Sequence, residues 1–199
     1  MLALTGCAAK GERVDISIPP PPASSVSQSA VTVAQSKVGL RVVVSPFEDA
    51  RSDRMHLGSR SHFWGGTSYF DLPKTTVGEA VAKALVEQLN RRGWQASLAG
   101  QNGAAQPDAT ISGSIRDLSV TAVSRFFHTE IAVKNTLMMR VANHSDESSI
   151  QERVLGSGSN DVFWFDPEDA EQLVNEVLEK NIEKFVADTK VDGRAVRLK

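Results

Sequence analysis

The strongest constraint on the fold is an amphipathic stretch at residues 166–188. Asp166 suits an N-cap, Pro167 suits the first helical position, and acidic residues follow in the first turn. Apolar residues form one stripe along this expected helix. Burying each of the larger side chains contributes about 1.5–3 kcal/mol, so the stripe must lie on a sheet. Its members recur at steps of three and four residues: Ala170, Leu173, Val174, Val177, Leu178, Ile182, Phe185 and Val186.

A second helix is expected at residues 76–92. Thr76 and Glu79 have the spacing of a capping box, and Gly93 follows two arginines as a typical stop. One apolar stripe runs along this segment and consists of Val77, Ala80, Val81, Ala84, Leu85 and Leu89.

The remaining periodic segments predict strands. Residues 38–47 are β-branched and almost continuously apolar, and residues 94–98 form a short strand. Residues 108–123 alternate, with a bulge expected near Arg116, and residues 129–143 alternate more cleanly. Residues 149–159 return as a further strand, in which GSGS at 156–159 indicates a flexible strand end. The expected fold is α+β, in the order β-α-β-β-β-β-α, with two helices packed on one face of a mostly antiparallel sheet.

Composition limits the domain count and the partners. A chain of 199 residues with 41% hydrophobic and 23% charged residues can bury one good core. The net charge of −2 gives no broad basic field, which argues against nucleic-acid binding.

The stretch LTGC at residues 4–7 contains the only cysteine. A single cysteine excludes an intramolecular disulfide and a cysteine-based zinc site within the printed sequence. Small residues before Cys7 and a polar run after it are typical of a bacterial lipobox, in which the sulfur carries a diacylglycerol. Ala8 stands where an inner-membrane retention signal would have aspartate, so we expect a periplasm-facing protein held at the cell outer membrane by lipid.

These features divide the chain into four predicted parts. Residues 1–6 are too short for a secretory h-region and lack a basic n-region, so they are interpreted as a residual piece of signal peptide. Residues 7–37, with four consecutive prolines and many serines, form the lipidated cysteine and a tether. Residues 38–190 are a single α+β domain, and residues 191–199 are a flexible tail.

The chain resembles the YajG-type lipoproteins of Gram-negative envelopes. The resemblance rests on the lipobox and on the segments VVVSPFEDAR, VGEAVAKALVEQLNRRGW, ATISGSIRDL and DAEQLVNEVLEKNIEKFVAD, in the same order over most of residues 1–190. The long Pro/Ser tether and the extended segment 47–74 depart from the family pattern. The resemblance implies a location and a fold, and no biochemical activity.

The segment 47–74 is the best candidate for a binding site, because a loop this long in a small domain is usually functional or disordered. Aromatic residues and arginine together are typical of binding hot spots. The residues expected to contact a partner are Arg51, Arg54, His62, Phe63, Trp64, Tyr69 and Phe70. The run FWF at 163–165 could likewise contact a partner or pack in the core, and we expect it to pack mainly in the core.

Neither catalysis nor cofactor binding is expected. His56 and His62 are six residues apart and match no strong metal-ligand motif. The sequence has no GxSxG, SxxK or HExxH motif. We therefore expect no enzyme, no metal and no cofactor, although a periplasmic hydrolase or metal-binding protein stays open as a weaker alternative.

Two classes of function remain. The first is a membrane-anchored envelope lipoprotein whose domain binds a protein partner or helps an assembly. The second is a self-assembling, ring-type subunit of a secretion or export complex, in which an open sheet edge joins copies of the chain.

Replacement of Cys7 by alanine tests the anchor directly. In cells that express the full precursor and are fed an alkynyl fatty acid, the wild-type chain takes up label and sediments with outer membrane. The Cys7→Ala variant takes up none and leaves the membrane fraction, because the acyl chains need the sulfur. Equal behaviour of the two proteins, unlabelled and in the supernatant, would contradict the lipobox interpretation.

Overall fold

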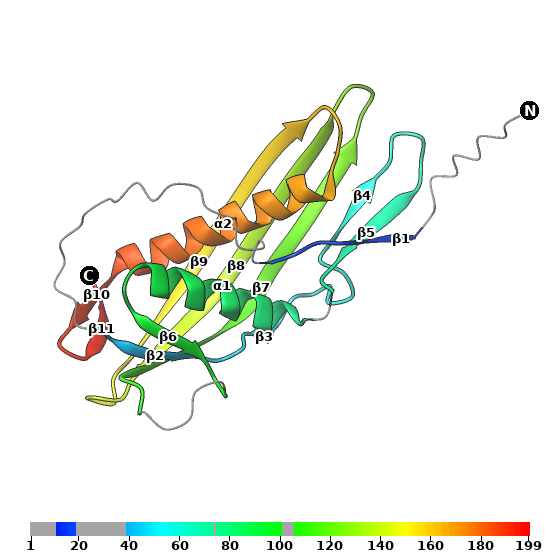
Figure 1. Cartoon of the computed structure of the whole chain (residues 1–199). Coiled ribbons are helices and arrows are strands. Elements are labelled where there is room, and N and C mark those ends of the chain that lie inside the picture. The colour runs from blue at the N-terminus through cyan, green and yellow to red at the C-terminus, as the bar shows by residue number, and fades with distance from the viewer. Residues whose placement is uncertain (1–10, 19–38, 74, 101–105) are drawn as a thin grey trace, which may run out of the picture.

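Three long strands form the centre of the computed structural model, which describes residues 11–18, 39–73, 75–100 and 106–199 (Figure 1). They are β7 (Ala109–Ser124), β8 (Thr129–Asn143) and β9 (Ser149–Val162). β8 pairs antiparallel with both neighbours over nearly its whole length. The expected antiparallel meander is therefore present.

The other edge of β7 pairs with three short strands in succession. β2 (Arg41–Val44), β3 (Glu48–Asp49) and β4 (Gly58–Ser61) all run parallel to it. Beyond β2 lies β6 (Gln95–Leu98), and beyond β4 lie β5 (Thr67–Asp71) and then β1 (Glu12–Asp15). In the described residues these strands form one nine-stranded mixed sheet.

Both helices, α1 (Val77–Arg91) and α2 (Pro167–Asp188), lie on the same face of this sheet (Figure 1). The Thr76 hydroxyl accepts from the Glu79 amide, and Asp166 forms a capping box with Asp169, so both predicted helix starts are confirmed. Side chains join the helices to each other: Gln88 Nε2 donates to Glu179 Oε1 over 2.6 Å, and Arg92 pairs with Glu183 at 3.1 Å.

Two glycines of β9 allow α2 to approach the sheet closely. A Cβ atom at Gly158 would lie 2.8 Å from Val177 Cγ2, and one at Gly156 would lie 2.5 Å from Asn181 Oδ1. The segment 156–159 lies inside β9, where it pairs with β8. Its interpretation as a flexible strand end was therefore wrong: the glycines make room for a helix.

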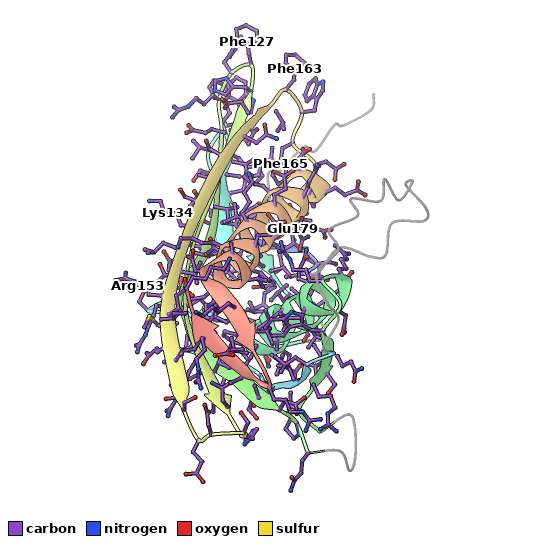
Figure 2. The ribbon with its side chains drawn as sticks, turned by 90° about the vertical axis from the view of Figure 1, so that its left-hand side faces the viewer. Phe127, Lys134, Arg153, Phe163, Phe165 and Glu179 are labelled. Atoms are coloured by element: carbon purple, nitrogen blue, oxygen red, sulfur yellow. The ribbon has the colours of Figure 1, made fainter. Side chains whose placement is uncertain are left out.

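The core lies between the helices and the sheet, and no described helix or strand covers the opposite sheet face (Figure 2). On β8 the odd-numbered residues point into the core, and Lys134 projects from the uncovered face, as does Arg153 of β9 (Figure 2). On β7 the inward residues are odd-numbered as far as Ile115 and even-numbered from Leu118, because a bulge lies between Ile115 and Asp117. The predicted bulge is confirmed.

The α+β class and the two helices agree with the sequence analysis, but the predicted element order does not. The prediction lacked β1, β3, β4 and β5, and it lacked a hairpin after α2. These strands are two to five residues long, and several are polar, such as ERVD, ED and GSRS. Strands this short carry little signal of their own, and they form because β7, β4 and β5 offer free edges to pair with.

Part of the predicted tether belongs to the folded domain. Residues 12–15 form β1, and Ile16 and Ile18 are buried in the core. Residues 11–18 thus belong to the domain rather than to a tether. The other predicted tether residues, 7–10 and 19–37, lie outside the described residues, as does the predicted signal-peptide remnant at 1–6.

The predicted flexible tail is folded. β10 (Thr189–Asp192) and β11 (Ala195–Leu198) form an antiparallel hairpin after α2. The backbone N–H of buried Val196 donates to Asn143 Oδ1 over 2.8 Å, and its carbonyl accepts from Asn143 Nδ2 over 3.0 Å. These buried hydrogen bonds fix the hairpin against the end of β8.

Two single-residue deletions in β7 test the bulge. Deletion of Arg116 removes the extra residue and keeps Ile115 and Leu118 on the core face, so we expect the free energy of unfolding to fall by about 1 kcal/mol or less. Deletion of Ser119 turns Val120 and Ala122 outward, which costs at least about 3 kcal/mol. Urea unfolding followed by circular dichroism measures both, and equal losses in the two variants would contradict the assigned register.

Candidate functional site: an aromatic end of the sheet

Three connections meet at the end of the sheet where β7 finishes and β8 begins. They are the β4–β5 turn at 62–66, the β7–β8 turn at 125–128 and the β9–α2 connection at 163–166. Ser61 of β4 pairs with Val123 of β7, and Thr129 of β8 pairs with Val162 of β9. Strand pairing therefore brings together segments that are about 100 residues apart.

Two rings stand at the apex of the β4–β5 turn. The His62 amide donates to the Gly66 carbonyl over 3.1 Å, and the turn is completed by Gly65 and Gly66, whose φ angles are +86° and +102°. Only glycine adopts such angles without strain. The glycine pair thus lets the chain reverse and leaves Phe63 and Trp64 in solvent.

The β7–β8 turn has aromatic residues where turn-forming residues are expected. Arg125 N–H donates to the His128 carbonyl over 2.7 Å, so Phe126 and Phe127 are the two central residues. Such positions usually hold Gly, Asn, Asp or Ser. Both rings are about two-thirds exposed, so neither turn geometry nor core packing explains them.

The β9–α2 connection divides its three rings between core and solvent. Phe165, just before the N-cap, lies under the Arg60 guanidinium at 4.2 Å and 5.9 Å from the Phe70 ring. Phe163 and Trp164 are exposed. The expectation that this run is mainly core was wrong for two of its three residues, because the chain leaves the sheet after Val162 and turns back only at Phe165.

We call the six exposed rings the aromatic end; their exposed fractions range from 46% to 87%. They are half of the twelve aromatic residues of the chain, and the other six are half-buried or buried. Phe63 contacts Phe126 with centroids 5.6 Å apart, and Phe163 lies with Phe127 at the same extremity (Figure 2). The aromatic end consists of Phe63, Trp64, Phe126, Phe127, Phe163 and Trp164.

Of the residues predicted to contact a partner, Arg51 is structural. It is 6% exposed and donates two hydrogen bonds of 2.9 Å to the Asp49 carboxylate. Its Nη1 also donates to the carbonyls of His56 and Leu118. The hydrogen bonds from Arg51 hold the pKa of Asp49 below its ordinary value.

Three other predicted contacts are also used within the fold. Phe70 is fully buried, and Tyr69 stacks on the His56 ring at 4.3 Å. His62 Nε2 lies 3.0 Å from Ser68 Oγ, and burial lowers the pKa of His62, with a smaller effect from Arg60. Arg54, Phe63 and Trp64 remain exposed, and Phe63 and Trp64 lie at the aromatic end.

The segment 47–74 is therefore not the single long loop that the sequence analysis assumed. It contributes β3, β4 and β5, and only the β4–β5 turn reaches the aromatic end. Phe126 and Phe127 were not recognised as site residues. The available signal was an aromatic pair in a tight connection between two alternating strands.

A hollow of about 460 Å³ near Arg51 is lined by charged, polar and apolar side chains, and several of its charged groups are paired with each other. Asp71 lies 2.7 Å from His56 Nδ1 and 3.6 Å from Arg13. In the residues that the structure describes, no three His, Cys, Asp or Glu side chains gather closely enough to hold a metal ion. Nor does either helix there have the length and apolar character that a bilayer crossing requires.

Comparisons with known proteins give likenesses of fold only. No family model and no curated protein matches the chain, whereas 42 chains of solved structures do. A Xanthomonas campestris protein of the family DUF330 is 12% identical, with a TM-score of 0.49 over 89% of this chain and 93% of that one.

Two further matches are a lipoprotein and a dodecameric protein, each from a bacterium. A Neisseria meningitidis lipoprotein is 10% identical, with a TM-score of 0.38 over 74% of this chain and 99% of that one. PelC of Paraburkholderia phytofirmans, a dodecamer, is 13% identical, with a TM-score of 0.38 over 71% and 86%. Bacterial lipoproteins are thus among the structural neighbours, but the specific YajG-type resemblance is not supported by these matches.

Replacement of Arg51 or Arg54 by alanine tests their different roles. Loss of the Arg51 side chain leaves the Asp49 carboxylate and two carbonyls without their donor, so we expect the free energy of unfolding to fall by at least about 2 kcal/mol. Arg54→Ala, its exposed neighbour, changes it by about 0.5 kcal/mol or less. Thermal or urea unfolding measures both, and an Arg51→Ala protein as stable as the unsubstituted chain would contradict the structural role of Arg51.

Proposed function

We propose that this protein is a lipid-anchored lipoprotein of the bacterial cell envelope, with a binding or assembly role and no catalytic one. The observation that carries the proposal is the aromatic end: six exposed rings on three neighbouring connections. Exposed apolar patches of this kind mark contact surfaces, because a solitary soluble domain gains nothing from them. Aromatic side chains are also over-represented where proteins bind.

The anchor is the second part of the proposal. The lipobox at residues 4–7 supports lipid attachment at Cys7, and Ala8 favours the outer membrane, with the domain facing the periplasm. The YajG-type resemblance agrees with this location. A non-catalytic role is supported by the sequence, which has no GxSxG, SxxK or HExxH motif.

Self-assembly is a second candidate, favoured by one observation. Within the described residues, β9 pairs only with β8, so the other edge of this long strand has free backbone donors and acceptors. Such an edge can pair with a strand of another copy.

Cysteine labelling in cells tests whether the aromatic end is a contact surface. Trp64→Cys and Trp164→Cys each keep five of the six rings, and Lys134→Cys and Arg153→Cys on the uncovered sheet face are matched controls. A maleimide that cannot cross membranes is added to cells with a permeabilised outer membrane and to detergent extracts. We expect the two aromatic-end cysteines to react more slowly in cells than in detergent, and the controls to react equally in both.

The unsubstituted chain sets the baseline, because an acylated Cys7 cannot react with maleimide. Equal reaction of all four variants in cells would overturn the proposed contact surface, and reaction of the unsubstituted chain would overturn the anchor. Light scattering during chromatography of the same extracts measures the molar mass and so tests self-assembly. A protein that stays monomeric at high concentration would contradict self-assembly.

A further inference from the structure

We infer that the aromatic end inserts into the surface of the lipid bilayer that holds the anchor, with the long strands directed away from it. The inference rests on the proposed function, since it takes Cys7 as the point of attachment. It names the partner of the aromatic end as lipid rather than protein. Two independent observations favour lipid: the place where the described chain begins, and the arrangement of the rings.

The first observation is the position of Gly11. Its backbone N–H donates to the carbonyl of Thr67 over 2.9 Å, and Glu12 pairs with Ser68. Thr67 is the first residue of β5, directly after the turn that holds Trp64. The described chain therefore begins beside the base of the aromatic end.

Chain length then fixes the reach of the anchor. Only four peptide units separate Cys7 from Gly11, and covalent geometry limits them to about 13–14 Å. Trp64 is three residues from Thr67, which is hydrogen-bonded to Gly11. The backbone of Trp64 therefore lies no farther from Gly11 than about the reach of the Cys7–Gly11 segment. The opposite end of β7, at Ala109, is 15 residues from Ser124, which corresponds to roughly 50 Å of strand. Lipid on Cys7 thus enters the bilayer at the aromatic end.

The second observation is the arrangement of the rings. They stand on three separate connections at the extremity of the molecule and project outward, as Phe127 and Phe163 do in Figure 2. Tryptophan prefers the headgroup level of a bilayer, and phenylalanine with other apolar residues inserts up to the acyl boundary. Three protruding loops are suited to a soft, deformable surface.

Charge at this end favours a zwitterionic bilayer. Arg125 lies 3.8 Å from Glu130, and His128 lies 3.9 Å from Asp161, so basic and acidic groups alternate around the rings. Among the described residues at this end, no cluster of basic residues is available to attract anionic headgroups. Insertion is therefore expected to be apolar in origin and to depend little on salt concentration.

Tryptophan fluorescence tests the inference, because the three tryptophans divide between the two ends. Trp64 and Trp164 belong to the aromatic end, whereas Trp94 precedes β6, whose residues pair with β2 at the Ala109 end of β7. The full lipidated chain is reconstituted into phosphatidylcholine vesicles, with and without bromine on the acyl chains near the headgroup. Bromine quenches only indole rings that touch the lipid.

Two variants assign the signal, and both keep a ring at every changed position. Trp94→Phe leaves the two indoles of the aromatic end, and we expect it to lose emission in brominated vesicles at low and at high salt. Trp64→Phe combined with Trp164→Phe leaves Trp94 alone, and its emission is expected to be the same in both kinds of vesicle. Circular dichroism confirms that both variants are folded.

The outcomes separate this inference from the proposed function. If the aromatic-end tryptophans of the anchored protein are not quenched while the aromatic-end cysteines are protected in cells, the inference is overturned and the aromatic end contacts an envelope protein. If the tryptophans are not quenched and the cysteines are not protected, both the inference and the proposed contact surface are overturned. Quenching in vesicles that contain no other protein establishes lipid as the partner.

Discussion

β7 carries hydrogen bonds on both of its edges, and the rest of the sheet depends on this double pairing. One edge pairs with β8 along its length, and the other is shared by β2, β3 and β4 in turn. A strand of 16 residues can keep an apolar face against two helices only if its apolar side chains point to the helix-covered face along its whole length. The bulge at Arg116 changes the phase once, and the core is continuous on both sides of it.

This pairing also explains how the aromatic end arises. The connections that hold its rings are far apart in the sequence, and each one follows or precedes a strand whose register is fixed by β7 or β8. The hydrogen-bonded strands therefore place exposed aromatic residues at one extremity, while the ion pairs of α1 and α2 and the β10–β11 hairpin stabilise the remainder. The aromatic end is thus separate from the core, so its exposed rings contribute little to the stability of the fold.

The sequence was sufficient for elements whose signal is local. Both helices, the meander and the bulge follow from caps, stripes and alternation within single segments. The short strands β1, β3, β4 and β5 were not predicted, because their pairing depends largely on the edges of distant strands. For the same reason Phe63 and Trp64 were recognised as candidates, whereas Phe126 and Phe127 were not: only the folded sheet shows that these turns are neighbours.

Arg51 and Phe70 were misjudged because arginine and phenylalanine in a polar segment look exposed until the strands that bury them are known.

The parallel pairing of β1 with β5 has a mechanical consequence. A pull on the chain at Gly11, directed past the β4–β5 turn, acts along the axis of β1 and opposite to its direction. The hydrogen bonds of its four paired residues, and the bond from the Ile16 amide to the Asp71 carbonyl, are then loaded together in shear instead of being opened one after another. Beyond β1, the Ser17 amide donates to Glu171 of α2 over 2.8 Å, so the load passes into the helix layer as well as the sheet. The first strand is thus built as a tension-bearing joint between the domain and whatever holds its N-terminal side.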